Sequence, residues 1–155
     1  MKALMWVVIW FCLFFVMLLA ACSQSVTVTP DPNAAKPSNA GGLGQAVSLQ
    51  GDASRGKEIF QNTCSTCHGE EGKGGVENAG SDDGTVPTLN PIDETLVNKD
   101  PKVFGANLDL FLEHGSTPAG TNPAKVMLNY GDSKVLTSQQ IADVIAYIIS
   151  LNPPK

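Results

Sequence analysis

Two cysteines and a histidine stand together in the segment Cys64-Ser65-Thr66-Cys67-His68. Two thiols at this spacing, with a histidine directly after the second, are the pattern for covalent attachment of haem, in which the thiols add to the vinyl groups and the imidazole binds the iron. On a helix the cysteines lie about one turn apart, so both thiols and the imidazole can reach one macrocycle. The segment therefore predicts one covalently bound haem c, with His68 as an iron ligand.

Two other uses of these cysteines agree less well with the rest of the sequence. A redox-active disulfide of this spacing belongs to a βαβ unit, and the flanking segments do not read as strands. A structural zinc site needs four ligands, but beyond residue 22 the chain has no cysteine besides Cys64 and Cys67 and no histidine besides His68 and His114. Covalent haem is the interpretation that uses all three residues of the motif.

The opposite face of the iron needs a ligand from elsewhere, and beyond residue 22 only Met127 and His114 offer a thioether or an imidazole. Met127 lies 59 residues after His68 in a stretch with the proline and glycine content of a loop, and a thioether ligand would raise the reduction potential. As alternatives, Met127 fills a gap in the core, or His114 binds the iron. His114 ends a predicted helix before Gly115, where an imidazole interacts favourably with the helix dipole without any metal. We predict ligation by Met127, with His114 as the second choice.

The first 22 residues read as an export signal. An unbroken apolar run extends from Ala3 to Ala21, and Leu19-Ala20-Ala21-Cys22 has the form of a bacterial lipoprotein cleavage box. Cleavage would leave Cys22 as the lipidated first residue. Alternatively the run is retained as a membrane anchor, because its 19 residues approach the length that spans a bilayer. Both interpretations place the chain at a bacterial cell membrane, with the remainder on the periplasmic or extracellular side.

The remainder divides into a linker and one folded domain. Residues 22–50 are rich in serine, threonine, proline, asparagine, alanine and glycine, which predicts a flexible linker. Residues 51–155 hold 8 basic and 14 acidic side chains, a net charge of −6, which argues against nucleic-acid binding and favours partners with basic docking faces. We therefore predict a signal peptide or membrane anchor (1–21), a lipidated N-terminus with a flexible linker (22–50) and a domain (51–155).

Helices are predicted at both ends of this domain. Asp52 is a suitable N-cap for a helix that ends near Cys64. Thr137 caps the last helix, and Gln140 completes a capping box. An apolar stripe marks the core face of this last helix: Ile141, Val144, Ile145, Ile148 and Ile149.

A glycine inside the first predicted helix points to a close helix crossing. Gly56 is costly in a helix unless another backbone must approach it. We expect the last helix to cross there, with Tyr147 packed over Gly56 and Phe60. No segment alternates with the period of a strand, so we predict an all-α domain whose thin apolar core is completed by a buried macrocycle.

From Gly51 to Leu151 the sequence resembles a class I c-type cytochrome. The resemblance is carried by residues 51–60, the haem-attachment segment followed by Gly69, Val86-Pro87-Thr88-Leu89, the Met127 loop, and Leu136-Thr137 before a tyrosine-bearing helix. It implies a few helices around one haem, and a backbone carbonyl, here that of Pro87, which accepts a hydrogen bond from the proximal histidine. Val86 and Leu128 depart from the family pattern, which usually has glycine and proline at these positions.

The predicted function is one-electron transfer by a single-haem protein tethered at the outer face of a bacterial membrane, with redox proteins as its partners. It is a carrier and not itself an enzyme. An alternative is a fixed haem subunit of a larger respiratory or photosynthetic complex, such as the quinol-oxidising alternative complex III or a terminal oxidase. A haem-based ligand sensor would require that Met127 leave the iron open. The acidic segment 70–83 is either a solvated loop or a docking patch.

Overall fold

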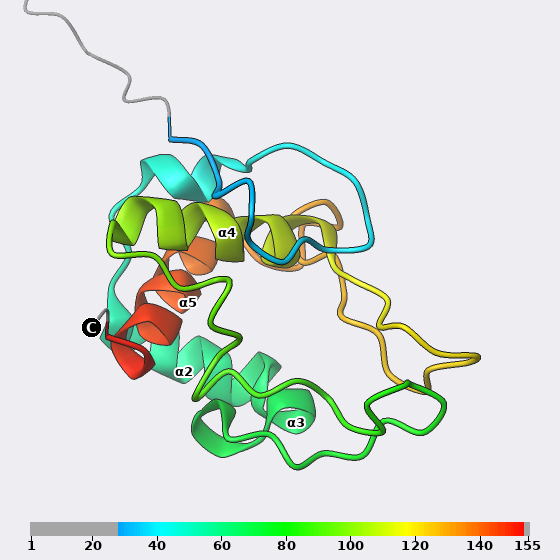
Figure 1. Ribbon diagram of the computed structural model, residues 1–155. Helices are drawn as coiled ribbons and strands as arrows, with labels where there is room; N and C mark the ends of the chain where they lie inside the picture. Colours follow the sequence, from blue (N-terminus) through cyan, green and yellow to red (C-terminus); the bar gives the residue numbers. More distant parts are fainter. Residues whose placement is uncertain (1–27, 154–155) are drawn as a thin grey trace, which may run out of the picture.

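The structure is a computed structural model that describes residues 28–153 (Figure 1). This part of the chain contains η1 (Gln45–Ser48), α2 (Ala53–Thr63), α3 (Ser65–His68), η2 (Glu70–Gly72), α4 (Pro101–His114) and α5 (Ser138–Leu151). Between residues 28 and 153 there is no strand, and two isolated bridges join Glu77 to Thr85 and Ser116 to Met127. The prediction of an all-α fold is confirmed.

The predicted leader, residues 1–21, and the predicted lipidation site Cys22 lie outside the described residues. Among the helices within 28–153, none has the length and apolar character needed to cross a bilayer.

The predicted caps of α2 and α5 are confirmed. The Oδ1 atom of Asp52 accepts hydrogen bonds from the backbone N–H groups of Ser54 (2.8 Å) and Arg55 (3.1 Å) at the start of α2. At the start of α5, the hydroxyl of Thr137 accepts from the backbone of Gln140, whose side chain accepts from the backbone of Thr137 (2.9 Å). These bonds satisfy N–H groups that have no partner inside the helix.

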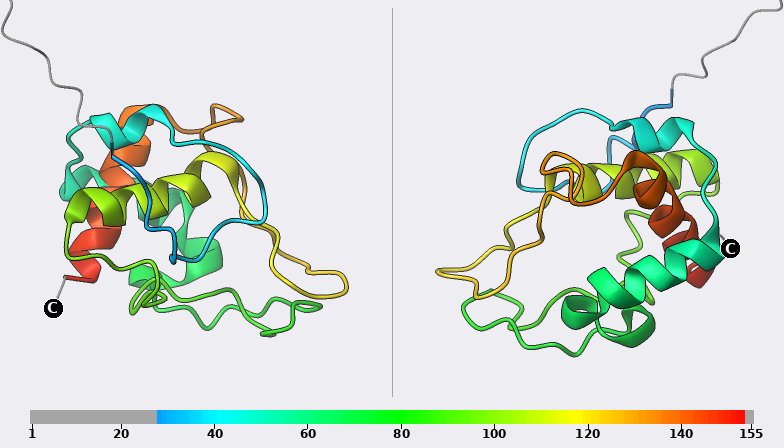
Figure 2. Two further views of the ribbon diagram at one scale, coloured as in Figure 1. Left: turned by 45° about the horizontal axis from the view of Figure 1, so that its top comes forward. Right: turned by 180° about the vertical axis from the view of Figure 1, so that it is seen from behind.

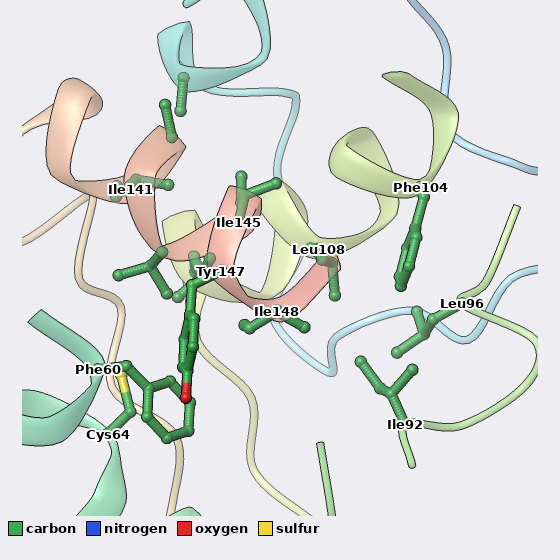
Figure 3. Packing of buried hydrophobic residues seen from close by; sticks show 14 of the residues in the cluster. Phe60, Cys64, Ile92, Leu96, Phe104, Leu108, Ile141, Ile145, Tyr147 and Ile148 are labelled. Carbon is green, nitrogen blue, oxygen red and sulfur yellow. The ribbon is translucent and has the colours of Figure 1, made fainter. Parts of the chain in front are cut away.

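The crossing of α2 and α5 is the tightest contact of the fold. A Cβ atom on Gly56 would lie 1.9 Å from the backbone oxygen of Asp143, so only glycine allows this approach. The rings of Phe60 and Tyr147 meet edge to face with centroids 5.3 Å apart, as Figure 3 shows. Asp143, only 2% exposed, accepts two hydrogen bonds of 2.9 Å from the guanidinium of Arg55. The predicted packing of Tyr147 at this crossing is therefore confirmed.

A second layer of the core lies between α4 and α5. Asp100 caps α4, and Pro101 occupies its first position, where a missing N–H costs nothing. Leu108 and Phe104 of α4 belong to the same buried cluster as Ile145 and Ile148 of α5, and Figure 3 labels all four. The stretch between η2 and α4 adds the buried side chains of Ile92 and Leu96.

The prediction of a flexible linker is wrong for residues 28–50, which we call the N-terminal strap. The strap runs across α4 (Figures 1 and 2) and includes η1, and its Ala34 and Ala46 are buried. Its backbone N–H groups at Asp31 and Gly44 bind the side chains of Asn107 (2.8 Å) and Asp109 (2.7 Å) on α4. The composition of the strap could not indicate this, because its partners are polar side chains 76 and 65 residues away.

Candidate haem site

The haem-attachment motif occupies one short helical turn directly after α2. The backbone N–H of His68 donates to the carbonyl of Cys64 at 2.9 Å, and Gly69 ends the turn with a φ of 78°. Both thiols are free: Cys64 is buried and Cys67 is half-buried. Burial, and then the neighbouring Cys67, raise the pKa of Cys64 to about 12, so this thiol is protonated at neutral pH. The turn therefore brings together the thiols of Cys64 and Cys67 and the imidazole of His68.

Pro87 fixes the orientation of His68. The Nδ1 atom of the imidazole lies 3.0 Å from the carbonyl oxygen of Pro87, the contact that the resemblance implies. Burial lowers the pKa of His68, while the bond to Pro87 opposes this shift, so the neutral ring is favoured. A carbonyl only accepts, so Nδ1 carries the proton and Nε2 presents its lone pair. A hydrogen bond of this kind fixes the ring and raises its basicity as a metal ligand.

The segment around Pro87 is held by backbone bonds to the loop that follows the motif. Val86 donates to the carbonyl of Val76 (2.9 Å), and Leu89 donates to that of Gly72 (2.8 Å). Val86, which stands where glycine is usual in the family that the sequence resembles, is buried. The valine side chain therefore contributes apolar contact and leaves the carbonyl of Pro87 in reach of His68.

Met127 lies on a loop that packs against the same buried cluster as Cys64. Met127 itself is half-buried, whereas its neighbours Val126 and Leu128 are 46% and 54% exposed. Its backbone exchanges two hydrogen bonds with Ser116, of 2.8 and 3.0 Å, directly after the end of α4. This extended pairing turns Met127 to the side opposite its two exposed neighbours.

Tyr130, three residues after Met127, packs against the buried cluster that includes Cys64. Burial, and then the charges of Cys64 and Cys67, raise the pKa of Tyr130. Sequence analysis missed Tyr130, although its position three residues after a candidate ligand was a usable signal. Met127 and Tyr130 thus both pack against the buried cluster that includes Cys64.

His114 is placed differently from His68, because both of its ring nitrogens have partners. Nδ1 lies 2.8 Å from Oδ2 of Asp132, and Nε2 lies 2.7 Å from the carbonyl oxygen of Gly42 in the strap. The bond to Asp132, the larger effect, raises the pKa of His114 despite partial burial. Its predicted place at the end of a helix before Gly115 is confirmed. In this arrangement His114 offers no free nitrogen to a metal.

The residues at the motif fit a covalently bound haem. Two thiols at the required spacing lie on one turn, and the imidazole beside them has a free Nε2. The thioether of Met127 lies on a loop that packs against the buried cluster that includes Cys64. Among the described residues, no cluster of three or more histidine, cysteine or acidic side chains could hold a metal ion by itself. Two thiols that can form thioether links and one imidazole that can bind iron are the groups that a covalently attached haem requires.

Comparison with known proteins agrees with this chemistry. A sequence model of the family described as Cytochrome c matches residues 53–152, which is well over half of the chain. The chain belongs to the cytochrome c family. As a cytochrome c it binds covalent haem c and transfers electrons between redox partners, acting as a carrier. No curated protein and no solved structure matches the sequence significantly.

Proposed function

We propose that this cytochrome c carries single electrons at the outer face of a bacterial membrane, with one haem held between His68 and Met127. The observation that carries the proposal is the contrast between the histidines: Pro87 leaves Nε2 of His68 free, whereas both nitrogens of His114 are bound. When bound, haem supplies the one-electron couple of ferrous and ferric iron.

Each residue of the site has a separate task. Cys64 and Cys67 attach the macrocycle, and Pro87 keeps the imidazole of His68 neutral and aimed. The thioether of Met127 would favour the ferrous state and raise the reduction potential. Together, His68 and Met127 would hold the iron and leave no position for oxygen or another small ligand. This distinguishes a carrier from a ligand sensor.

The tether supports a second candidate, a fixed haem subunit of a larger membrane complex. Export through residues 1–21 and lipidation at Cys22 would anchor the domain on the outer side of the membrane. Because residues 28–50 pack on the domain, residues 22–27 alone would separate it from the anchor. Six residues span at most about 20 Å, which suits a domain held near neighbouring membrane subunits.

The ligand assignment is tested by absorption spectra of the oxidised protein. The wild type should show the weak red charge-transfer band of sulfur-ligated ferric haem, and Met127→Ala should lose it. His114→Ala is the matched control and should keep the band. A wild type without the band, or a band that survives in Met127→Ala, contradicts ligation by Met127. Carbon monoxide binding to the reduced wild type at neutral pH would instead favour a sensor.

The carrier and the subunit are distinguished by solubilising membranes in mild detergent. Comigration of the haem protein with large integral subunits favours the fixed subunit, and free migration favours the carrier. The mass of the purified chain tests the anchor. Lipidation at Cys22 adds the mass of the acyl groups, and cleavage before Cys22 removes the mass of residues 1–21. A mass of the full chain plus one haem would instead indicate a retained anchor.

A further inference from the structure

Two loops meet at the end of the molecule away from the helix crossing. Figures 1 and 2 show the stretch after η2 and the stretch after α4 side by side there, in green and yellow. Three backbone hydrogen bonds join them, from Asp82 to Ala119 (2.9 Å), from Ala124 to Ala79 (2.8 Å) and from Asn122 to Gly80 (3.3 Å). We call residues 76–86 and 116–127 the clasp.

Asn78 is the buried centre of the clasp. Its side chain is only 1% exposed, and both of its polar atoms bind the backbone of Lys125. Oδ1 accepts from the N–H of Lys125 at 2.7 Å, and Nδ2 donates to the carbonyl of Lys125 at 3.0 Å. Asn78 is itself fixed, because its backbone binds Gly84 (2.9 Å) and Ser81 (3.2 Å). The side-chain amide of Asn78 therefore pairs with both backbone groups of Lys125, as a residue of a neighbouring β-strand would, and so joins the two loops.

This attachment lies two residues before Met127. On its other side Met127 is held by Ser116, at the end of α4. Within residues 28–153, Asn78 is the one residue whose side chain hydrogen-bonds to the backbone of residues 118–128. None of the helices described within 28–153 includes any residue of this stretch. Next to Met127 the loop is therefore held by Ser116 on one side, and on the other by Asn78 together with the backbone hydrogen bond from Ala124 to Ala79.

We propose that Asn78 is a positioning residue for the Met127 ligand; this proposal rests on the ligation by Met127 proposed above. Removing the amide leaves the N–H and carbonyl of the half-buried Lys125 without these partners, so the clasp would loosen next to Met127 while its three backbone hydrogen bonds remain. The loop could then withdraw the thioether from the iron without unfolding the helices. Asn78 acts through the backbone at Lys125 and does not itself touch the iron site.

The experiment compares the full-length holoproteins of wild type, Asn78→Ala, Met127→Ala and Asn107→Ala. Asn107 is the matched control, because it is an equally buried asparagine (1% exposed) whose amide also bridges two backbone groups, those of Asp31 (2.8 Å) and Leu96 (2.9 Å). The readouts are the affinity of the ferric protein for added imidazole, the red charge-transfer band and the reduction potential. Helical circular dichroism reports whether each variant is folded.

For Asn78→Ala we expect imidazole affinity to rise about tenfold or more, the size expected when two part-buried hydrogen bonds are lost. The charge-transfer band should weaken, and the potential should fall towards that of Met127→Ala. Asn107→Ala should lose stability but keep the imidazole affinity, band and potential of the wild type.

Unchanged imidazole affinity in Asn78→Ala, or an equal rise in Asn107→Ala, would overturn the positioning role while leaving ligation by Met127 intact. A charge-transfer band that survives in Met127→Ala would overturn the ligand assignment itself, and the role of Asn78 with it. If Asn78→Ala does not fold, Asn78→Asp replaces it, because the acid keeps Oδ1 for the N–H of Lys125 and loses the donor to its carbonyl. An imidazole affinity of Asn78→Asp equal to that of the wild type would also overturn the proposal.

Discussion

The two sides of the haem site are held by different means. On one side, Cys64, Cys67 and His68 occupy a single turn that continues α2, and α2 is locked to α5 at Gly56. On the other side, Met127 lies on a loop that two distant segments hold by backbone hydrogen bonds. We call these the helix-held side and the loop-held side.

This difference in support predicts which side of the haem site loses its structure first when a contact is removed. Loss of a contact within the helix crossing should disturb the whole domain, because the crossing also carries the edge-to-face pair of Phe60 and Tyr147. Loss of a contact on the loop-held side should release Met127 and leave the helices folded. Few buried apolar contacts and many backbone bonds in a loop are typical of regions that open locally. The predictions below separate these two responses.

The largest effect is expected at the helix crossing. Gly56→Ala would place a Cβ atom 1.9 Å from the backbone oxygen of Asp143, so α2 and α5 must move apart. We expect a loss of about 3 kcal/mol in the free energy of unfolding, the upper end for overpacking a tight contact. In urea unfolding, helical circular dichroism and the haem absorption bands should shift together, because both sides of the site depend on the crossing.

A second buried helical glycine provides the control. A Cβ atom on Gly105 of α4 would lie 3.4 Å from the side chain of Ile145, an ordinary contact. Gly105→Ala should therefore be neutral or stabilising by up to about 1 kcal/mol, because alanine is the better helix former. If Gly56→Ala proves as stable as Gly105→Ala, the close approach of α2 to α5 at Gly56 does not determine the stability of the fold.

The helix-held side could be predicted from sequence because its signals are local. The motif spans five residues, and the cap of α2 lies within three residues of the groups it binds. The capping box of α5 is equally short. Only the pairing of Gly56 with α5 required a long-range inference, and the cost of a helical glycine supplied it.

The loop-held side could not be predicted in the same way. Asn78 and Lys125 are 47 residues apart, and asparagine in a glycine-rich loop is far more often a turn residue than a buried bridge. The strap was missed for a related reason, because its low apolar content predicts disorder. It is held instead by its backbone N–H groups, which every residue except proline carries whatever its side chain.

A smaller effect is expected where the strap meets α4. Asp109 is fully buried, and of its two oxygens Oδ2 accepts from Gly44 while Oδ1 has no partner. Burial, the largest cause, raises the pKa of Asp109 to about 6, and nearby Glu113 adds to the shift. Between its ordinary pKa and 6 the folded state therefore binds more protons than the unfolded state, and stability falls as the pH rises.

Asp109→Asn removes this pH dependence. The amide oxygen of the asparagine can still accept from Gly44. Its neutral NH₂ group replaces the carboxylate charge that Glu113 repels. We expect the variant to match the wild type near pH 4 and to exceed it by about 2 to 3 kcal/mol at pH 7 in urea unfolding. Asp83→Asn, at an exposed position of the clasp, is the control and should show no such divergence. If the difference in the free energy of unfolding between Asp109→Asn and the wild type is the same at pH 4 and at pH 7, ionisation of Asp109 does not destabilise the fold.

The smallest effect is expected at His114, which joins the strap to the segment after Met127. Both of its partners, Asp132 and the carbonyl of Gly42, only accept, so both bonds require the protonated ring. Because Asp132 in particular raises its pKa in the folded state, the stabilisation is present below the ordinary pKa of 6.5 and is lost as the pH rises through the folded value. His114→Gln should remove this loss, which we expect to be below about 1 kcal/mol because Asp132 is half-exposed. The check is the difference between urea midpoints at pH 6 and pH 8, which Asp132→Asn should also reduce. If the difference between the two midpoints is undiminished in both variants, the hydrogen bonds of His114 to Asp132 and to the strap do not stabilise the fold.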